Sequence, residues 1–230
     1  MLGIIGAMDE EVAKIKDLMS EVHIVKKAGM DFYIGKMWSK DIVVVRSGIG
    51  KVNAGICTQI LVDEFGIDAV INTGIAGSLN ADINIGDIVL STDALQHDMD
   101  ATGFGYAPGV IPRMETSVFT ADEKLRKLAK ESCERVNGDI NVFEGRVVSG
   151  DQFISDKSKK KYILDNFNGY CTEMEGAAIA QVAYLNSIPF LIIRAISDKA
   201  DDSATEDYPV FEEKAIRHSV RLMEDMVKNI

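Results

Sequence analysis

The sequence of 230 residues is poor in cysteine and has no long apolar run. Its three cysteines, Cys57, Cys133 and Cys171, are widely spaced and form no CxxC pair. An odd, scattered set of this kind argues against a disulfide framework or a zinc site, and it predicts reduced thiols in a cytoplasmic protein. No apolar stretch approaches the roughly 20 residues of a membrane-spanning helix, and the amino terminus lacks the basic region of a signal peptide.

Basic residues are also fewer than acidic residues. There are 25 lysines and arginines against 36 aspartates and glutamates, and the formal net charge is −11. A nucleic-acid backbone or an anionic membrane attracts basic surfaces, so this balance argues against both as partners and leaves small neutral or cationic ligands. The length and the 47% hydrophobic content suit one α/β domain that covers residues 1–230.

Apolar segments and amphipathic segments alternate along most of the chain. This order predicts a three-layer α/β/α sandwich around a mixed, mainly parallel sheet. Loops are expected at 101–118, where apolar side chains stand among glycines, and at 201–209, which is acidic. The expected strands are 2–6, 23–28, 30–37, 41–47, 68–73, 87–93, 142–149 and 190–198, and the main helices are 8–19, 51–65, 121–136, 173–187 and one from about 211.

The strand at 190–198 is almost entirely apolar but ends on Arg194, Ser197 and Asp198. Such a strand is typical of the centre of a sheet whose carboxyl end opens into a ligand site. In a regular strand Arg194 and Asp198 share a face about 13 Å apart, too far for a direct ion pair. The pattern therefore predicts that Asp198 is a carboxylate at the rim of the sheet.

Three glutamates precede or begin helices. Glu11 borders the apolar stripe of the first helix, although an interpretation as a complement to the helix dipole stays open. Glu175 lies three and four residues before Ala178 and Ile179 and heads the inward stripe of its helix, which makes it a candidate for the site. Glu173 points about 160° away and is better interpreted as a helix cap.

Two other segments suggest known binding motifs but lack residues that those motifs require. Gly50-Lys51 suggests a phosphate-binding P-loop, but Val45 stands where that loop needs glycine and Val52 where it needs serine or threonine. The segment His97-Asp-Met-Asp100 suggests a metal cluster but has no third partner at a suitable spacing. We therefore expect neither a metal nor a cofactor.

The remaining pattern favours carboxylate chemistry. Glu11, the glycine-containing turn expected at 73–78, the segment 152–154, Glu175 and Asp198 all follow strand ends, so we expect them around one crevice. Three carboxylates beside the aromatic Phe153 suit a neutral ligand that carries a ring and hydroxyl groups. Paired carboxylates of this kind cleave glycosidic bonds, one by protonating the leaving atom and one by handling water.

Six segments in order along the whole chain resemble the successive motifs of the 5′-methylthioadenosine/S-adenosylhomocysteine nucleosidases, which belong to the nucleoside phosphorylase superfamily. The resemblance implies a nucleoside phosphorylase-like fold, a homodimer, and hydrolysis of these adenine nucleosides in methionine salvage. The segments are Gly6-Ala-Met-Asp-Glu-Glu11, Ser47-Gly-Ile-Gly-Lys-Val52, Asn72-Thr-Gly-Ile-Ala-Gly77, Ser149-Gly-Asp-Gln-Phe-Ile154, Glu173-Met-Glu-Gly-Ala177 and Arg194-Ala-Ile-Ser-Asp198.

The resemblance also implies roles for single residues. Asp198 protonates N7 of adenine, Ser197 helps to orient it, and Glu11 activates the attacking water with Arg194 nearby. Glu175 accepts hydrogen bonds from the ribose hydroxyls. The other implied substrate contacts are Met174 and Glu173 near the sugar, Ile75, Ala76 and Gly77 in the glycine segment, Phe153 and Ile154 at the base, Met8, Ile49 and Tyr208 around the 5′-thioalkyl group, and Phe104, Tyr106 and Pro112 from the 101–118 loop of the partner subunit.

The sequence departs from the family pattern at Ile75, where the family commonly has serine, and Ala101 is small for a wall of the 5′ pocket. Three alternatives stay open. A phosphorylase on the same fold is disfavoured because Glu11 would repel phosphate. A hydrolase of aminofutalosine or 5′-deoxyadenosine fits the same residues. The third alternative is a nucleoside-binding protein without catalytic activity. It is disfavoured because such a protein does not need both Glu11 and Asp198, and both are present.

Overall fold

The computed structural model describes residues 1–201 and 204–230, and the side chains of all of these except residues 205–209. Its elements, in chain order, are β1 (Leu2–Gly6), α1 (Asp9–Asp17), β2 (Ser20–Lys27), β3 (Met30–Met37), β4 (Lys40–Arg46), α2 (Lys51–Phe65), β5 (Ala69–Ser78), β6 (Ile88–Gln96), the 3₁₀ turn η1 (Thr102–Phe104), β7 (Phe119–Thr120), α3 (Glu123–Val136), β8 (Val142–Ser149), α4 (Lys157–Phe167), β9 (Cys171–Glu173), α5 (Gly176–Leu185), β10 (Phe190–Asp198) and α6 (Ala204–Asn229).

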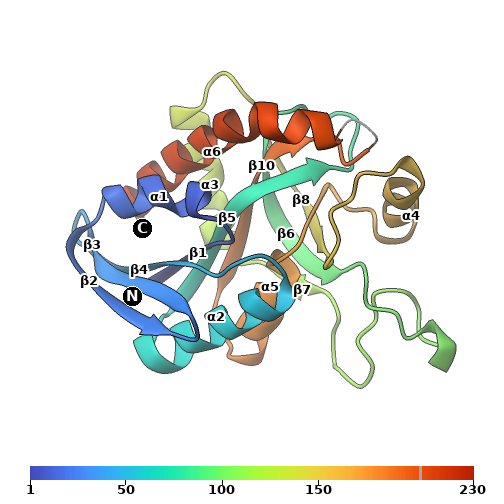
Figure 1. Ribbon diagram of the computed structural model, residues 1–230, viewed down its shortest axis with the longest axis horizontal. Helices are drawn as coiled ribbons and strands as arrows, with labels where there is room; N and C mark the ends of the chain where they lie inside the picture. The colour runs from blue at the N-terminus through green and yellow to red at the C-terminus, as the bar shows by residue number, and fades with distance from the viewer. Residues whose placement is uncertain (202–203) are drawn as a thin grey trace.

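The helices form two layers with the sheet between them, as the sequence pattern predicts. In Figure 1, α1, α3 and α6 cover one face of the sheet, and α2 and α5 cover the other. The central strands β5 and β10 are buried along almost their whole length because helices lie on both sides. Within the described ranges, no helix has the length and apolar character to cross a membrane.

The sheet is mixed, and half of it closes on itself. Strand β10 pairs with both β5 and β6, β6 pairs with β8, β8 with β9, and β9 with β5, so these five strands form a ring. Strands β1, β4, β3 and β2 extend from β5 as an open arm, and β2, β3 and β4 form the expected antiparallel meander. The alternation of strands and helices did not predict this closure.

The ring changes how the site is assembled. Strand β10 runs parallel to β5, but β9 runs antiparallel to β5, and β8 runs parallel to β9. The expectation that Glu11, Glu175, Asp198 and the segment 152–154 meet because they follow parallel strands is therefore wrong for the segment after β8 and for Glu175, which follows β9. That segment reaches the site because β9 connects β8 to β5 at Gly77.

Three expected boundaries are wrong. The turn expected at 73–78 is the continuation of β5, which runs to Ser78 and pairs there with β9 and β10. The expected loop at 201–209 is shorter, because α6 already begins at Ala204. Glu175 lies not inside its helix but at the position just before it, without a capping hydrogen bond from its side chain, because α5 begins at Gly176.

Candidate active site

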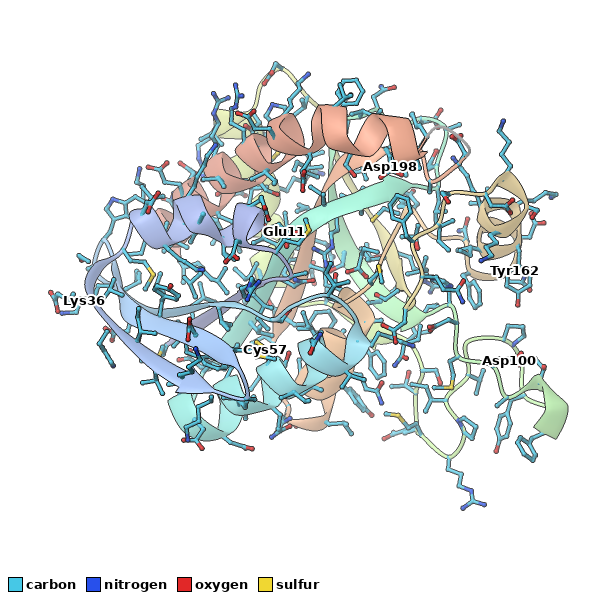
Figure 2. The ribbon with its side chains drawn as sticks, in the orientation of Figure 1. Glu11, Lys36, Cys57, Asp100, Tyr162 and Asp198 are labelled. Atoms are coloured by element: carbon cyan, nitrogen blue, oxygen red, sulfur yellow. The ribbon has the colours of Figure 1, made fainter. Side chains whose placement is uncertain are left out.

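A cavity of about 510 Å³ lies above the ends of β5 and β10, between the start of α1 and the start of α5. Figure 2 shows two of its residues, Glu11 at the first turn of α1 and Asp198 at the end of β10. Four of its lining residues are acidic and the others are apolar or neutral. The lining consists of Ala7, Met8, Glu11, Ile49, Ile75, Ala76, Gly77, Phe153, Thr172, Glu173, Met174, Glu175, Ser197 and Asp198.

A bulge in β10 directs both Ser197 and Asp198 to the cavity. Ile196 pairs with Ala76 and Asp198 pairs with Gly77, so Ser197 is an extra residue opposite β5. The bulge also breaks the regular alternation, and the expectation that Arg194 and Asp198 share a face in a regular strand is wrong: Asp198 lines the cavity and Arg194 does not. A bulge leaves no signal in an apolar run, which is why the pattern missed it.

The Asp198 carboxylate is held by its own chain. Ser197 Oγ donates to Oδ2 over 2.8 Å, and the backbone N–H of Ala200 donates to Oδ1 over 2.7 Å. Gly77 leaves room for this arrangement, because a Cβ there would lie 2.7 Å from Asp198 Oδ1. Asp198 is 2% exposed, so its carboxylate is presented to the cavity in one orientation.

Glu11 is fixed by three backbone N–H groups. Ala7 and Met8 donate to Oε2 over 2.6 and 3.0 Å, and Ile75 donates to Oε1 over 3.2 Å. Burial raises the pKa of Glu11, while Arg194 and these N–H groups oppose that shift. The sequence raised a doubt at Ile75, which lacks the serine hydroxyl of the family, but its contact with Glu11 is made by the backbone and does not depend on the side chain.

Arg194 lies beneath the cavity and is fully buried. Its Nη2 donates to Glu173 Oε2 and to Asn72 Oδ1, and it lies 3.9 Å from Glu175 Oε2. Burial disfavours the charged guanidinium, but the carboxylates of Glu173, Glu175 and Glu11 outweigh that effect and raise the pKa of Arg194. A single cation thus balances the acidic cavity from below.

Glu173 acts as a cap for α5, as its position in the sequence suggests. Its Oε2 accepts the backbone N–H groups of Glu175 and Gly176 over 3.1 and 2.8 Å, and Ser149 Oγ donates to its Oε1. Because the carboxylate also pairs with Arg194, its acceptor positions are largely occupied by the protein. Glu173 therefore shapes the cavity wall and is less available to a ligand than Glu175.

Glu175 faces the cavity from the N-terminal end of α5. Its Oε1 accepts the backbone N–H of Gly50 over 2.8 Å, and the side chain is almost fully buried. Burial and then the neighbouring Glu173 carboxylate raise the pKa of Glu175 to about 7. The group is therefore partly protonated near neutral pH and can both donate to and accept from hydroxyl groups.

The segment after β8 forms a narrow recess of about 30 Å³ beside the main cavity. Ile154 lines this recess but not the main cavity, whereas Phe153 lines both and is 47% exposed. The segment is anchored through Asp151, whose carboxylate accepts the backbone N–H of Lys51 and whose own N–H donates to Asp98. Figure 1 shows the connection after β8 passing close to the start of α2.

Four expected contacts are not placed in the cavity. The side chain of Tyr208 lies outside the described side chains. Phe104, Tyr106 and Pro112 do not line the cavity of their own chain, and Phe104 is 88% exposed. Figure 1 shows that the loop that carries them projects away from the body.

Sequence reasoning missed two lining residues, Ala7 and Thr172. Ala7 lies between β1 and α1, so its place in the cavity wall could have been inferred from that of Glu11 in the first turn of α1. Thr172 lies on the three-residue strand β9, whose pairing with β5 no local pattern predicts. Among residues 1–201 and 204–230, no group of three or more His, Cys, Asp or Glu side chains could hold a metal ion.

Comparison with known proteins shows the family of this chain. The family model of the phosphorylase superfamily matches residues 1–228. The 5′-methylthioadenosine/S-adenosylhomocysteine nucleosidase of Staphylococcus saprophyticus is 43% identical over 232 residues, which cover 100% of both chains.

Two solved structures share the fold over the full length. The Neisseria meningitidis 5′-methylthioadenosine/S-adenosylhomocysteine nucleosidase in complex with methylthio-immucillin-A has a TM-score of 0.95 and 36% identity, with 100% of this chain and 99% of that chain covered. The futalosine hydrolase of Helicobacter pylori has a TM-score of 0.94 and 34% identity, with 100% and 97% covered. The chain belongs to the phosphorylase superfamily and, within it, to the 5′-methylthioadenosine/S-adenosylhomocysteine nucleosidase family.

Proposed function

We propose that this protein is a cytoplasmic enzyme that hydrolyses the N-glycosidic bond of 5′-methylthioadenosine and S-adenosylhomocysteine and releases adenine. The observation that carries the proposal is the charge of the cavity wall: among the side chains that the structure describes, every ionisable one that lines it is a carboxylate, and the cation Arg194 lies below the floor. A phosphate nucleophile needs cationic or N–H donors, so this wall favours water over phosphate.

In the proposed mechanism Asp198 protonates N7 of the departing adenine, and Ser197 holds the carboxyl in place. The Ser197 hydroxyl and the Ala200 N–H bind the two carboxyl oxygens. Protonation of the base makes it a better leaving group while the sugar develops oxocarbenium character. Phe153 stacks on the base, and the recess at Ile154 receives its edge.

Glu11 activates the water that attacks the sugar. The three N–H groups that hold its carboxylate leave little freedom for it to turn, so one orientation faces the cavity. The raised pKa of Glu11 makes it a stronger base than an exposed glutamate. Glu175 binds the ribose hydroxyls, with Met174 beside it in the wall.

The test is to incubate the purified protein with 5′-methylthioadenosine with and without phosphate and to identify both products. Adenine and free methylthioribose, formed at a rate that phosphate does not change, are expected. Methylthioribose 1-phosphate that forms only with phosphate would make the enzyme a phosphorylase. No adenine under either condition would contradict the proposal and favour a nucleoside-binding protein.

A futalosine-type substrate is a second candidate, because a futalosine hydrolase shares the fold over the whole chain. The cavity contains Met8, Ile49 and Ile75, which are apolar side chains suited to a thioalkyl group. We therefore expect a higher kcat/KM for 5′-methylthioadenosine than for aminofutalosine or 5′-deoxyadenosine. Parallel assays with the three nucleosides rank them directly.

We also propose that the enzyme is a homodimer in which the 101–118 loop closes the site of the partner. This loop projects from the body (Figure 1), and Phe104 within it is 88% exposed. Beside the cavity mouth, Ile49, Val52 and Ile56 expose 55, 72 and 44% of their surface at the start of α2. A contiguous exposed apolar surface next to a site is typical of a subunit contact.

Mixing two inactive variants tests this assembly. Phe104→Ala removes the loop contact, and Asp198→Asn removes the general acid. In a mixed dimer one site carries both defects and the other carries neither, so activity is expected to return on mixing to about a quarter of the wild-type level or less. A monomer in light scattering, or no recovery on subunit exchange, contradicts the proposal.

A further inference from the structure

The turn that follows β10 holds the Asp198 carboxylate and is itself strained. The backbone N–H of Ala200 in this turn donates to Asp198 Oδ1 over 2.7 Å. Ala200 is fully buried and has φ of 51°, a left-handed conformation that a residue with a Cβ adopts only at an energetic cost. Such a conformation persists where the surrounding structure enforces it, so the contacts of this turn bear on the orientation of Asp198.

A lysine holds the opposite end of the same peptide group. The Lys199 carbonyl and the Ala200 N–H belong to one peptide group, and in a trans peptide these two bonds point in opposite directions. The Lys199 carbonyl oxygen accepts a hydrogen bond from Lys160 Nζ over 2.5 Å. This peptide group therefore connects the Lys160 ammonium, bound at its oxygen, to the Asp198 carboxylate, bound at its N–H.

Lys160 reaches the turn from a separate helix. It lies on α4, and Figure 1 shows α4 on the side of the molecule at which α6 begins. The Lys160 side chain is only 20% exposed, whereas that of its neighbour Lys161 is 75% exposed and pairs with Asp165 on the surface of α4. Asp201 Oδ2 lies 3.9 Å from Lys160 Nζ, so the Lys199 carbonyl oxygen is the nearer of the two partners.

Two other contacts confine the turn without orienting this peptide group. Lys199 Nζ donates to the Ile83 carbonyl oxygen. Gly77 packs closely against the turn, because a Cβ at Gly77 would lie 2.8 Å from Ala200 Cβ. Both contacts limit where the turn lies, but neither fixes the rotation of the peptide group that directs the Ala200 N–H towards Asp198.

We propose that Lys160 is a positioning residue for the general acid Asp198. It binds the carbonyl oxygen of the peptide group, keeps Ala200 in its left-handed conformation and so directs the N–H to Oδ1. A cation at the carbonyl oxygen also polarises the peptide group and strengthens its N–H as a donor. The proposal rests on the proposed function, because it gives Lys160 a part in the protonation of the base by Asp198.

Steady-state kinetics test the proposal with Lys160→Met, which removes the ammonium and keeps a long side chain. With 5′-methylthioadenosine, kcat should fall about tenfold, the effect of one charge-assisted hydrogen bond. KM should change little because Lys160 does not line the cavity. Lys160→Arg keeps a cationic donor and should recover most of kcat. Lys161→Met is the matched control on the same helix and should leave both constants unchanged.

Combination with Asp198→Asn separates positioning from a general structural role. If Lys160 acts through Asp198, Lys160→Met should not lower kcat further in the Asp198→Asn background, because the general acid is already lost. A further loss of about tenfold in the double variant would overturn the proposal. An unchanged kcat in Lys160→Met alone would overturn it as well.

Hydrogen exchange of the Ala200 amide, followed by NMR, tests the contact without a chemical step. Lys160→Met should exchange this amide about tenfold faster than the wild type and Lys161→Met. Unchanged exchange would overturn the proposal whether or not the wild type releases adenine, and a wild type that releases none would contradict the proposed function separately. If Lys160→Met does not fold, the shorter and uncharged Lys160→Gln replaces it in all three experiments.

Discussion

Oε1 of Glu175 accepts the backbone N–H of Gly50 over 2.8 Å, although 125 residues separate the two along the chain. Gly50 has φ of 96°, a conformation that glycine adopts without strain, and it directs this N–H towards α5. The bond joins the starts of α2 and α5 at the cavity. One carboxylate therefore holds two elements together and, in the proposed function, binds the ribose.

Glu175→Gln should make stability less dependent on pH. The pKa of Glu175 is raised to about 7 from 4.5, so ionisation of the folded protein costs stability as pH rises between these values. The variant cannot ionise, and its amide oxygen can still accept from Gly50. Relative to the wild type, its free energy of unfolding should rise between pH 5 and 8 by up to about 3 kcal/mol. Urea titrations at both pH values measure this, and a constant difference would contradict it.

Asp198→Asn should lower kcat by roughly 10²–10⁴ if the carboxyl is the general acid. The amide keeps the shape of the side chain: its oxygen can still accept from the Ala200 N–H, and its NH2 group can donate to the Ser197 hydroxyl in place of the bond that Oδ2 accepted, so folding and KM should change little. The exposed Asp82→Asn serves as a control for charge and should turn over normally. Near-normal turnover by Asp198→Asn would remove this residue from the mechanism.

On the acid side of its pH profile, kcat/KM should fall at a pH above 4.5, the ordinary pKa of glutamate. This fall is the acid limb of the profile. Burial raises the pKa of Glu11, and a general base is active only when it is deprotonated, so activity falls as pH decreases through that raised value. Glu11→Gln should remove this limb together with most of the activity. A pH–rate profile between 4 and 9 tests the point, and an acid limb below 4.5 would exclude Glu11 as the titrating base.

Arg194→Met should destabilise the protein by about 3–5 kcal/mol, because it leaves the buried Glu173 without its cation. Arg217→Met is the matched control, since its pair with Glu213 lies on the surface of α6 and should contribute less than about 1 kcal/mol. Denaturant unfolding measures both. Adding Glu173→Gln to Arg194→Met should recover part of the loss, and additive losses would show that the pair does not act as described.

Gly74→Ala should disturb the floor of the site. A Cβ at Gly74 would overlap the Arg194 guanidinium and come 2.5 Å from Glu11 Oε1, and both groups are held by several hydrogen bonds. We expect a loss of about 1–3 kcal/mol in stability and a clear loss of kcat. Gly138→Ala, where a Cβ meets nothing within 4 Å, should be neutral in thermal melts and in the assay.

Local sequence patterns were sufficient to predict most of the helices and strands. The strand at 190–198 and the strand at 142–149 have the expected bounds because an apolar run between polar or turn residues is a local property. Helical spacing is also a local property, and it places Glu11 beside the inward apolar stripe of its helix. In the structure Glu11 is buried, whereas its neighbours Asp9 and Glu10 are exposed. The family resemblance supplied the roles that spacing alone left open.

The remaining features of the fold depend on pairing between strands that are far apart in the sequence. The closure of β10 onto β6, the pairing of β9 with β5 and the bulge at Ser197 depend on which strands meet, and no local pattern encodes that choice. These pairings place Asp198 and Thr172 in one row on either side of Gly77. They also decide that Arg194 lies below the cavity and that Glu175 reaches Gly50.

The sequence by itself therefore determined the layers of the fold, the acidic character of the site and the class of its chemistry, because these follow from periodicity, composition and ordered motifs. Only the tertiary structure decided which of the two carboxylates faces the cavity and which one caps a helix. The physical reason is that hydrogen-bond satisfaction is a property of the whole three-dimensional neighbourhood. Glu173 and Glu175 are two residues apart on the chain, yet their partners come from different elements.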